Sequence, residues 1–222
     1  MNPLKKTAVM IVEDHPLFSK GLASLIKTQT AYTIVGEAVN GAEAMELLRT
    51  EDPDLAIVDL NLGNEEGLEI IKDMKIYKPA LLVLVLSMHD ERFYAERVIG
   101  VGANGYIMKD EAANKVLDAI HTVLSGKTYI SEAEQVRLKS SGDVVMKSVA
   151  LDELSDRQFQ IFSLIGKGLG TREIAAKLNL SAKTVDTHKE HIKLRLHCDS
   201  AQQLRQLAIE WTNRAPAETE AR

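Results

Sequence analysis

Short apolar runs alternate with amphipathic stretches through the first 125 residues, and this alternation restricts the folds open to the chain. The apolar runs predict strands at about 7–13, 33–38, 54–59, 81–86 and 104–108. The amphipathic stretches predict helices at about 16–29, 41–50, 65–77, 91–100 and 111–125. Strands that alternate with helices in this way indicate a parallel sheet with helices on both faces. The run that begins at Leu55 is almost wholly apolar, as expected of a strand buried on both faces.

Polar residues with complementary chemistry follow four of these apolar runs. They are Glu13 with Asp14, Asp59, Ser87 and Lys109. Parallel strands place the residues at their carboxyl ends in a shared crevice. Three carboxylates there would repel one another and favour a divalent cation, while a hydroxyl and an ammonium could hold phosphoryl oxygens. Each residue alone is compatible with a solvated loop charge, but the four together predict a phosphoryl-accepting pocket.

The composition is that of a globular protein, with 45% hydrophobic and 27% charged residues. The longest apolar run, residues 80–86, is too short to cross a bilayer, and the basic start lacks the length and cleavage site of a signal peptide. The single cysteine, Cys198, excludes an intramolecular disulfide and fits a reducing compartment. We therefore expect a cytoplasmic protein with no membrane partner.

The net charge of −5 is unevenly distributed along the chain. Residues 1–125 hold 12 Lys and Arg against 19 Asp and Glu, whereas residues 153–222 hold 11 against 9. The acidic part suits a cation site. The later part is only mildly basic, so any binding of nucleic acid must depend on the local placement of Lys and Arg.

From Leu154 onward the apolar periodicity is helical only. Ser155 is the predicted N-cap of a first helix, whose apolar face comprises Phe159, Phe162, Leu164 and Ile165; helices at about 171–178, 182–196 and 200–213 follow. We expect a first domain over 1–128, a linker over 129–151 with a short helix near 131–138, a second domain over 152–213, and a disordered tail over 214–222.

Two sets of motifs resemble known families. Glu13-Asp14-His15-Pro16, Asp59 and residues 105–110 resemble the receiver domain of two-component response regulators. Residues 154–157, 173–178 and 181–188 resemble the LuxR-type helix-turn-helix, and the order of the two halves is similar to the NarL/FixJ class. The resemblance implies an α/β domain with a doubly wound, five-stranded parallel sheet of the flavodoxin/CheY-like type, followed by a small all-α domain of four helices.

The receiver resemblance also implies roles for the residues of the pocket. Asp59 is expected to accept the phosphoryl group, while Lys109 and Ser87 would hold its oxygens. Asp14, Asp59 and the backbone carbonyl of Asn61 would bind Mg²⁺ directly, with Glu13 acting through water. Tyr106 would rotate into the space that Ser87 leaves, which would reshape the face formed by helices 91–100 and 111–125. We interpret His15-Pro16 as a helix start rather than as a source of a metal ligand.

The third helix of the second domain is the predicted DNA reader. With Val185 facing inward, the core side also carries His188, Lys189, Ile192 and Leu196. We expect base contacts from Lys183, Asp186, Thr187 and Glu190, and phosphate contacts from Arg172, Ser181, Lys189 and Lys193. The last helix has an apolar stripe that serves the core and could also serve a dimer.

These features together predict a phosphorylation-controlled, non-enzymatic regulator of transcription. A sensor histidine kinase would phosphorylate Asp59, and the protein would then bind double-stranded DNA as a homodimer, with RNA polymerase as a further partner. Leu62-Gly63 replaces the family's usual Met-Pro pair, which leaves open a phosphorylation-independent regulator whose receiver serves dimerisation. An aspartyl-phosphate hydrolase of the haloacid dehalogenase type would need an acid two positions after the nucleophile, where Asn61 stands.

Overall fold

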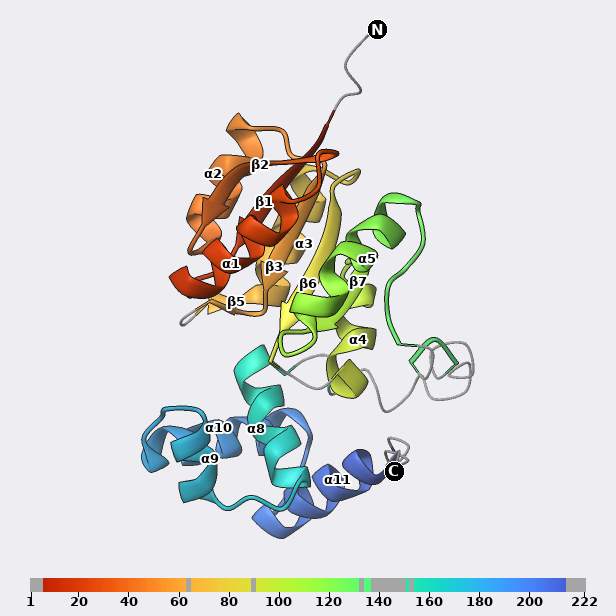
Figure 1. The fold of residues 1–222 in the computed structure, drawn as a ribbon. Helices are drawn as coiled ribbons and strands as arrows, with labels where there is room; N and C mark the ends of the chain where they lie inside the picture. The colour runs from red at the N-terminus through yellow and green to blue at the C-terminus, as the bar shows by residue number, and fades with distance from the viewer. Residues whose placement is uncertain are drawn as a thin grey trace, which may run out of the picture. The chain divides into compact units, whose positions relative to one another are not determined.

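The chain forms two compact units, residues 1–140 and 141–222 (Figure 1). This computed structural model describes residues 6–62, 65–88, 91–131, 134–136, 151 and 154–214. Among these residues, no helix has both the length and the apolar character that crossing a membrane requires.

The first unit is built on a five-stranded sheet in which every pairing is parallel. Its strands are β1 (Thr7–Val12), β2 (Tyr32–Ala38), β3 (Leu55–Asp59), β6 (Leu82–Ser87) and β7 (Gly105–Met108). Across the sheet the order is β2-β1-β3-β6-β7, so the winding reverses between β1 and β3. This is the flavodoxin-like order, in which ligands bind beyond the carboxyl ends of the strands at the reversal. The predicted fold class is confirmed.

Five helices connect and flank these strands. They are α1 (Pro16–Lys27), α2 (Gly41–Thr50), α3 (Gly67–Tyr77), α4 (Glu91–Gly100) and α5 (Ala112–Leu124). Pro16 occupies the first helical position of α1, where its fixed φ favours the helix and its missing N–H costs nothing. The Asn40 side chain caps α2 by accepting the Glu43 N–H at 2.8 Å.

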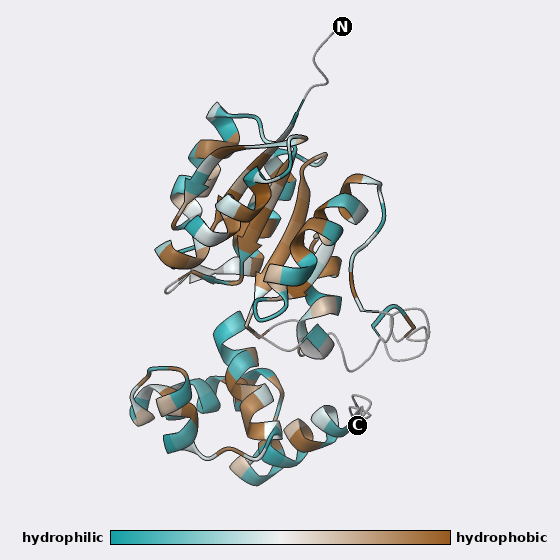
Figure 2. Ribbon diagram, in the orientation of Figure 1, coloured by the Kyte–Doolittle hydropathy of each residue, from teal (hydrophilic) through white to brown (hydrophobic). Residues whose placement is uncertain are grey.

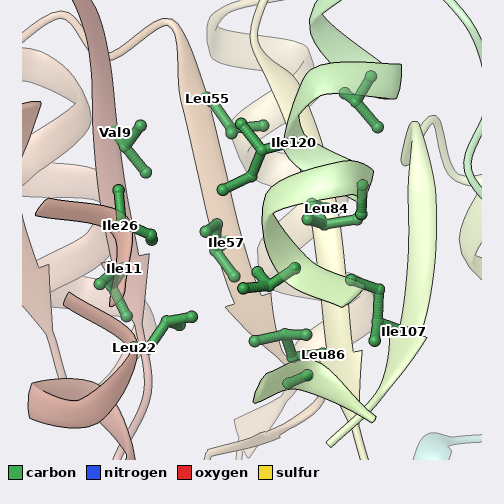
Figure 3. Close-up of a cluster of buried hydrophobic side chains, with 14 of the residues drawn as sticks. Val9, Ile11, Leu22, Ile26, Leu55, Ile57, Leu84, Leu86, Ile107 and Ile120 are labelled. Atoms are coloured by element: carbon green, nitrogen blue, oxygen red, sulfur yellow. The ribbon is translucent and has the colours of Figure 1, made fainter. Parts of the chain in front are cut away.

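Alternate residues of the strands face opposite sides of the sheet. On one face, Val9, Ile11, Ile57, Leu84 and Ile107 pack against buried residues of α1 and α5 (Figure 3). The intervening residues, such as Met10, Val58 and Val85, are also fully buried. Figure 2 shows the result as hydrophobic strands enclosed by helices of mixed polarity. The double burial makes the sheet rigid and fixes the positions of the strand ends.

The helix predicted from residue 65 begins two residues later than expected. Asn61–Leu62 (β4) pairs in antiparallel fashion with Glu65–Glu66 (β5), so this segment leaves the sheet as a small hairpin. Gly67 follows at once, and its N–H donates to the Leu60 carbonyl at 3.3 Å. A Cβ at position 67 would lie 2.5 Å from the Leu60 Cα, so the close approach requires glycine and delays the helix. Gly63 lies outside the described residues.

The second unit contains the four predicted helices: α8 (Asp156–Gly166), α9 (Thr171–Lys177), α10 (Ala182–Arg195) and α11 (Ala201–Arg214). Ser155 and Gln158 form a reciprocal capping box at the start of α8. The Trp211 ring of α11 lies 5.2 Å from the Phe159 ring and 5.7 Å from the Phe162 ring, centroid to centroid. These aromatic contacts pack α11 against α8.

Little of the predicted linker falls within the described residues. Residues 134–136 are helical, and the Glu134 N–H donates to the Ser131 hydroxyl at 3.3 Å, as a capped helix start requires. The remainder of the helix predicted near 131–138, the polar stretch 139–143 and the tail beyond Arg214 lie outside the described residues.

Candidate functional site

Asp59 is the last residue of β3, and its side chain is almost fully buried where the sheet's winding reverses. One carboxylate oxygen, Oδ1, accepts the backbone N–H of Asn61 at 3.1 Å. The other, Oδ2, accepts from the Lys109 ammonium at 2.8 Å. Burial raises the pKa of Asp59 from 3.8 to about 6, although Lys109 acts in the opposite direction. A buried carboxylate with a perturbed pKa at a strand end is typical of a functional group.

Lys109 links two of the buried carboxylates. Its ammonium lies 2.6 Å from Oε2 of Glu13 and 2.8 Å from Oδ2 of Asp59, and its side chain is only 7% exposed. The same ammonium lies 4.7 Å from the centre of the Phe18 ring, at the start of α1. The Lys109 N–H donates to the Ser87 carbonyl at 2.8 Å, which ties the lysine to the end of β6. The ammonium therefore has a fixed position beside Asp59.

Both of these carboxylates belong to an acidic cluster. Ligand atoms of Glu13, Asp14, His15 and Asp59 all lie within 4.8 Å of one another. The His15 Nδ1 is 3.0 Å from Oε1 of Glu13 and 2.8 Å from Oδ1 of Asp14. From the sequence, His15-Pro16 indicates only a helix start. Pro16 does begin α1, but the imidazole also lies within the cluster.

The cluster suits a divalent cation by its donor chemistry. Among the described residues, three carboxylates share the crevice with one ammonium, so negative charge is in excess where burial makes it costly. Carboxylate and carbonyl oxygens are the ligands that hard cations such as Mg²⁺ prefer. Asp14 is the more accessible acid, with a side chain 27% exposed against 2% for Glu13. The residues present therefore fit a metal of this kind.

Ser87 and Tyr106 lie on the strands beyond Asp59. Leu86 pairs with Asp59 across β3 and β6, so Ser87 is one residue further toward the carboxyl edge. Tyr106 pairs with Val85 across β6 and β7, and its side chain is buried. The structure thus brings the ends of β1, β3, β6 and β7 together, as the strand-end pattern predicted.

In the second unit, α10 has the two faces that the 100° periodicity predicted. Val185 and Ile192 are buried, while His188 and Lys189 are partly buried. Lys183, Asp186, Thr187 and Glu190 are exposed. Burial lowers the pKa of His188, and the nearby Arg157 and His191 add to this effect. The half-buried imidazole agrees with the place predicted for His188 on the core side of the helix.

A short chain of hydrogen bonds joins α9 to α10. The Thr171 hydroxyl donates to Oδ1 of Asp186 at 3.1 Å and accepts from the Lys189 ammonium at 2.6 Å. The direction is fixed, because an ammonium only donates and an ionised carboxylate only accepts. Thr171 thereby holds Asp186 and Lys189, two residues predicted to contact DNA. No periodicity signal distinguishes Thr171, since the contact joins two helices.

The other predicted DNA-contacting residues surround the start and the exposed face of α10. Ser181 caps the helix by accepting the Thr184 N–H at 3.0 Å, and Arg172 is exposed on α9. The Lys193 ammonium lies 2.9 Å from Oε2 of Glu190, one turn away, so its charge is partly offset locally. Lys183 sits in the first turn of α10 and is exposed.

Each of the two units matches a known protein family. The family described as "Response regulator receiver domain" matches residues 9–121, and the family described as "Bacterial regulatory proteins, luxR family" matches residues 152–208. This chain belongs to the LuxR-type response regulators. It is a two-component, DNA-binding regulator of transcription, of the NarL/FixJ class that the sequence motifs indicated.

Individual relatives span nearly the whole response regulator. The oxygen regulatory protein NreC of Staphylococcus haemolyticus is 33% identical over 209 residues, covering 90% of this chain and 96% of the relative. A solved structure of the RcsB response regulator of Salmonella typhimurium is 25% identical in sequence to this chain. The match covers 91% of this chain and 97% of the RcsB chain, with a TM-score of 0.57. The structure of a LuxR-family response regulator from Aurantimonas is 30% identical, with a TM-score of 0.55. That match covers 58% of this chain and 91% of the Aurantimonas chain.

Proposed function

We propose that a sensor histidine kinase phosphorylates this response regulator on Asp59, and that the phosphoryl group controls its binding to DNA. The observation that carries the proposal is the buried Asp59 carboxylate held beside Lys109 at 2.8 Å. In the transfer, an Asp59 oxygen forms a bond to phosphorus as the bond from phosphorus to the kinase histidine breaks. The reaction would take place in the cytoplasm, where the chromosome and ATP-dependent kinases are found.

Mg²⁺ is the proposed cofactor of this transfer. Asp14, Asp59 and the Asn61 carbonyl would bind it directly, and Glu13 would do so through water. When bound, it would supply the charge neutralisation on which phosphoryl transfer depends. Lys109 and Ser87 would hold phosphoryl oxygens, by an ion pair and a hydrogen bond respectively.

Tyr106 is the proposed switch residue. It lies in β7, the strand that contacts both α4 and α5. Movement of the Ser87 hydroxyl toward a new dianion would open space that the ring can fill, and the α4–α5 face would change with it. A homodimer formed by the phosphorylated protein would favour paired half-sites one or more helical turns apart.

In the DNA complex, α10 would lie in the major groove. Lys183, Thr187 and Glu190 would read bases, as would Asp186, although its bond to Thr171 gives it a second role. Arg172, Ser181, Lys189 and Lys193 would contact phosphates and set the register. If the regulator activates transcription, RNA polymerase would be a further partner.

The test is to measure the affinity and stoichiometry of the full chain on a pool of genomic fragments, with and without acetyl phosphate and Mg²⁺. We expect tighter, dimeric binding only with the donor, together with acid-labile phosphate on the protein. The variant Asp59→Asn should lose both, whereas Asp73→Asn, an exposed position on α3, should lose neither. Phosphate uptake that survives in Asp59→Asn would refute the acceptor assignment.

Two other outcomes would point to other functions. Equal affinity with and without the donor would favour a phosphorylation-independent regulator. Turnover of a small phosphate ester would favour the hydrolase, although the amide Asn61 stands where such an enzyme carries its acid.

A further inference from the structure

The segment that follows α5 returns alongside β7, the edge strand of the sheet. Tyr129 forms a parallel bridge with Gly105. Its N–H donates to the Asn104 carbonyl at 3.0 Å, and its carbonyl accepts the Tyr106 N–H at 2.8 Å. Residues 127–131, which we name the return segment, thus extend the sheet at this edge. The strand that carries Tyr106 is held from both sides, by β6 and by the return segment.

Gly105 makes this pairing sterically feasible. A Cβ at position 105 would lie 3.0 Å from the Tyr129 Cβ and 3.0 Å from the Tyr129 carbonyl oxygen. It would also lie 2.9 Å from Cδ1 of Leu84, which is fully buried. Because the Tyr129 carbonyl oxygen is a backbone atom, the segment would have to shift by a few tenths of an ångström to accommodate a Cβ.

Contacts on both sides of the bridge anchor the return segment. Before it, the Lys127 N–H donates to the Thr122 carbonyl at 3.2 Å, which ends α5. After it, Ile130 is buried, and the Ser131 N–H donates to Oε1 of Glu91 at 2.8 Å. Glu91 lies in the first turn of α4. The segment therefore contacts β7, α4 and α5 within five residues.

The return segment is the first part of the chain that leads to the second unit. It is hydrogen-bonded to the backbone of Tyr106. The Tyr106 side chain is buried, and the backbone N–H of Tyr106 donates to the Tyr129 carbonyl. A shift of β7 at Tyr106, or of α4 at Glu91, changes one of the bonds that hold the return segment. The chain then runs on from the segment to the second unit, which begins at residue 141.

We propose that the return segment is the coupling element of this response regulator, and that Tyr129, Gly105 and Glu91 are positioning residues that transmit the state of Tyr106 and α4 to the linker. The proposal rests on the proposed function, since it needs a phosphorylation-dependent change at Asp59. It assigns the coupling to main-chain pairing at the β7 edge. Loss of the pairing should therefore leave phosphorylation of Asp59 intact. Phosphorylation should then no longer change the affinity for DNA.

The experiment uses the full chain and defines a coupling factor, the ratio of DNA dissociation constants without and with acetyl phosphate and Mg²⁺. The variants are Glu91→Ala, which removes the acceptor for Ser131, and Glu91→Gln, which retains a side-chain oxygen acceptor. Glu69→Ala is the matched control, because Glu69 is an exposed glutamate in the first turn of another helix. Gly105→Ala tests the bridge itself, and acid-labile phosphate is measured in every variant.

We expect the wild-type coupling factor to be about fivefold or more, as is usual for allosteric coupling. Glu91→Ala should lower it severalfold with unchanged phosphate uptake, and Glu91→Gln should restore it. Gly105→Ala, if folded, should give a factor near one. Amide hydrogen exchange should show faster exchange in residues 127–131 of Glu91→Ala, with residues 41–50 of α2 as an internal control.

The outcomes separate this inference from the proposed function. A normal coupling factor in Glu91→Ala despite faster exchange in residues 127–131 overturns the inference alone. So does a coupling loss that Glu91→Gln fails to restore, since the hydrogen bond would then not be the cause. A wild-type factor of one refutes phosphorylation control itself, and the inference falls with it.

Discussion

The ammonium of Lys109 lies 2.8 Å from the carboxylate of Asp59, although the two residues are 50 positions apart in the sequence. Both side chains are buried; Asp59 is the last residue of β3, and Lys109 comes directly after β7. The fold therefore supplies a fixed cation beside the one carboxylate that ends the central strand. A phosphoryl group on Asp59 would meet this positive charge without any rearrangement of the backbone.

The first prediction concerns the removal of that charge. Lys109→Met should lower the yield of acid-labile phosphate from acetyl phosphate at pH 7 by about tenfold or more, because a hydrogen bond to a charged group contributes about 1.5–3 kcal/mol. The control is Lys72→Met, which removes an exposed lysine paired with Glu69 on α3. Wild-type yield in Lys109→Met would show that the lysine does not stabilise the phosphorylated state.

The second prediction concerns the pH dependence of stability. Asp59 has a pKa of about 6 in the folded protein against an ordinary value of 3.8, so the folded state binds this proton more tightly than the unfolded state. The proton's contribution to stability is present below pH 4 and is lost as the pH rises through 6. Asp59→Asn should therefore be more stable than wild type at pH 7.5, by up to about 3 kcal/mol, and the advantage should vanish near pH 4.

Calorimetry of the full chain across this pH range, without Mg²⁺, tests the second prediction. The transition of the first unit should shift, while the transition of the second unit, followed by the fluorescence of Trp211, should not. A stability difference that is constant from pH 4 to pH 7.5 would mean that Asp59 does not titrate in this window.

The third prediction concerns the hydrogen bonds of Thr171. Thr171→Val removes the hydroxyl that joins Asp186 to Lys189, so the angle between α9 and α10 should be less well fixed. DNA affinity should fall about fivefold, while the slope of log K against log salt stays unchanged, because no phosphate contact is lost. Lys183→Met, a variant on the exposed face, should instead alter binding at a specific base pair.

Asp186→Asn completes this test, because the amide oxygen can still accept from Thr171. Near wild-type affinity and base preference in this variant would assign Asp186 a positioning role. A changed base preference, with Thr171→Val behaving as wild type, would instead assign Asp186 to direct base reading.

The fourth prediction concerns the capping box of α8. Ser155→Ala removes the acceptor for the Gln158 N–H at 3.3 Å and should destabilise the second unit by about 1 kcal/mol. Trp211 fluorescence reports this unit, because the ring packs on Phe159 and Phe162. Ser24→Ala, an exposed position on α1 in the first unit, should leave the Trp211 transition where it is. An unchanged transition in Ser155→Ala would show that the cap is redundant.

The sequence was most informative where a local pattern carries a global constraint. Five short apolar runs indicated the sheet, and the polar residues after four of them indicated the side chains at its carboxyl edge. The faces of α10 followed from helical periodicity once Val185 was placed inward. The helix predicted from about residue 65 begins at Gly67, because Gly67 approaches the Leu60 backbone closely. Helical periodicity does not encode a contact of this kind.

The sequence by itself determined the alternation of strands and helices, the acids, hydroxyl and ammonium of the pocket, and the helical character of the second unit. Each depends on residue type and on neighbours a few positions away. Only the tertiary structure decided that Lys109 bridges Glu13 and Asp59, that His15 joins the acidic cluster, and that Thr171 links α9 to α10. It also decided that Tyr129 pairs with the edge of β7. These contacts join separate elements, and their geometry is set by how the sheet and helices pack rather than by any local preference of the residues involved.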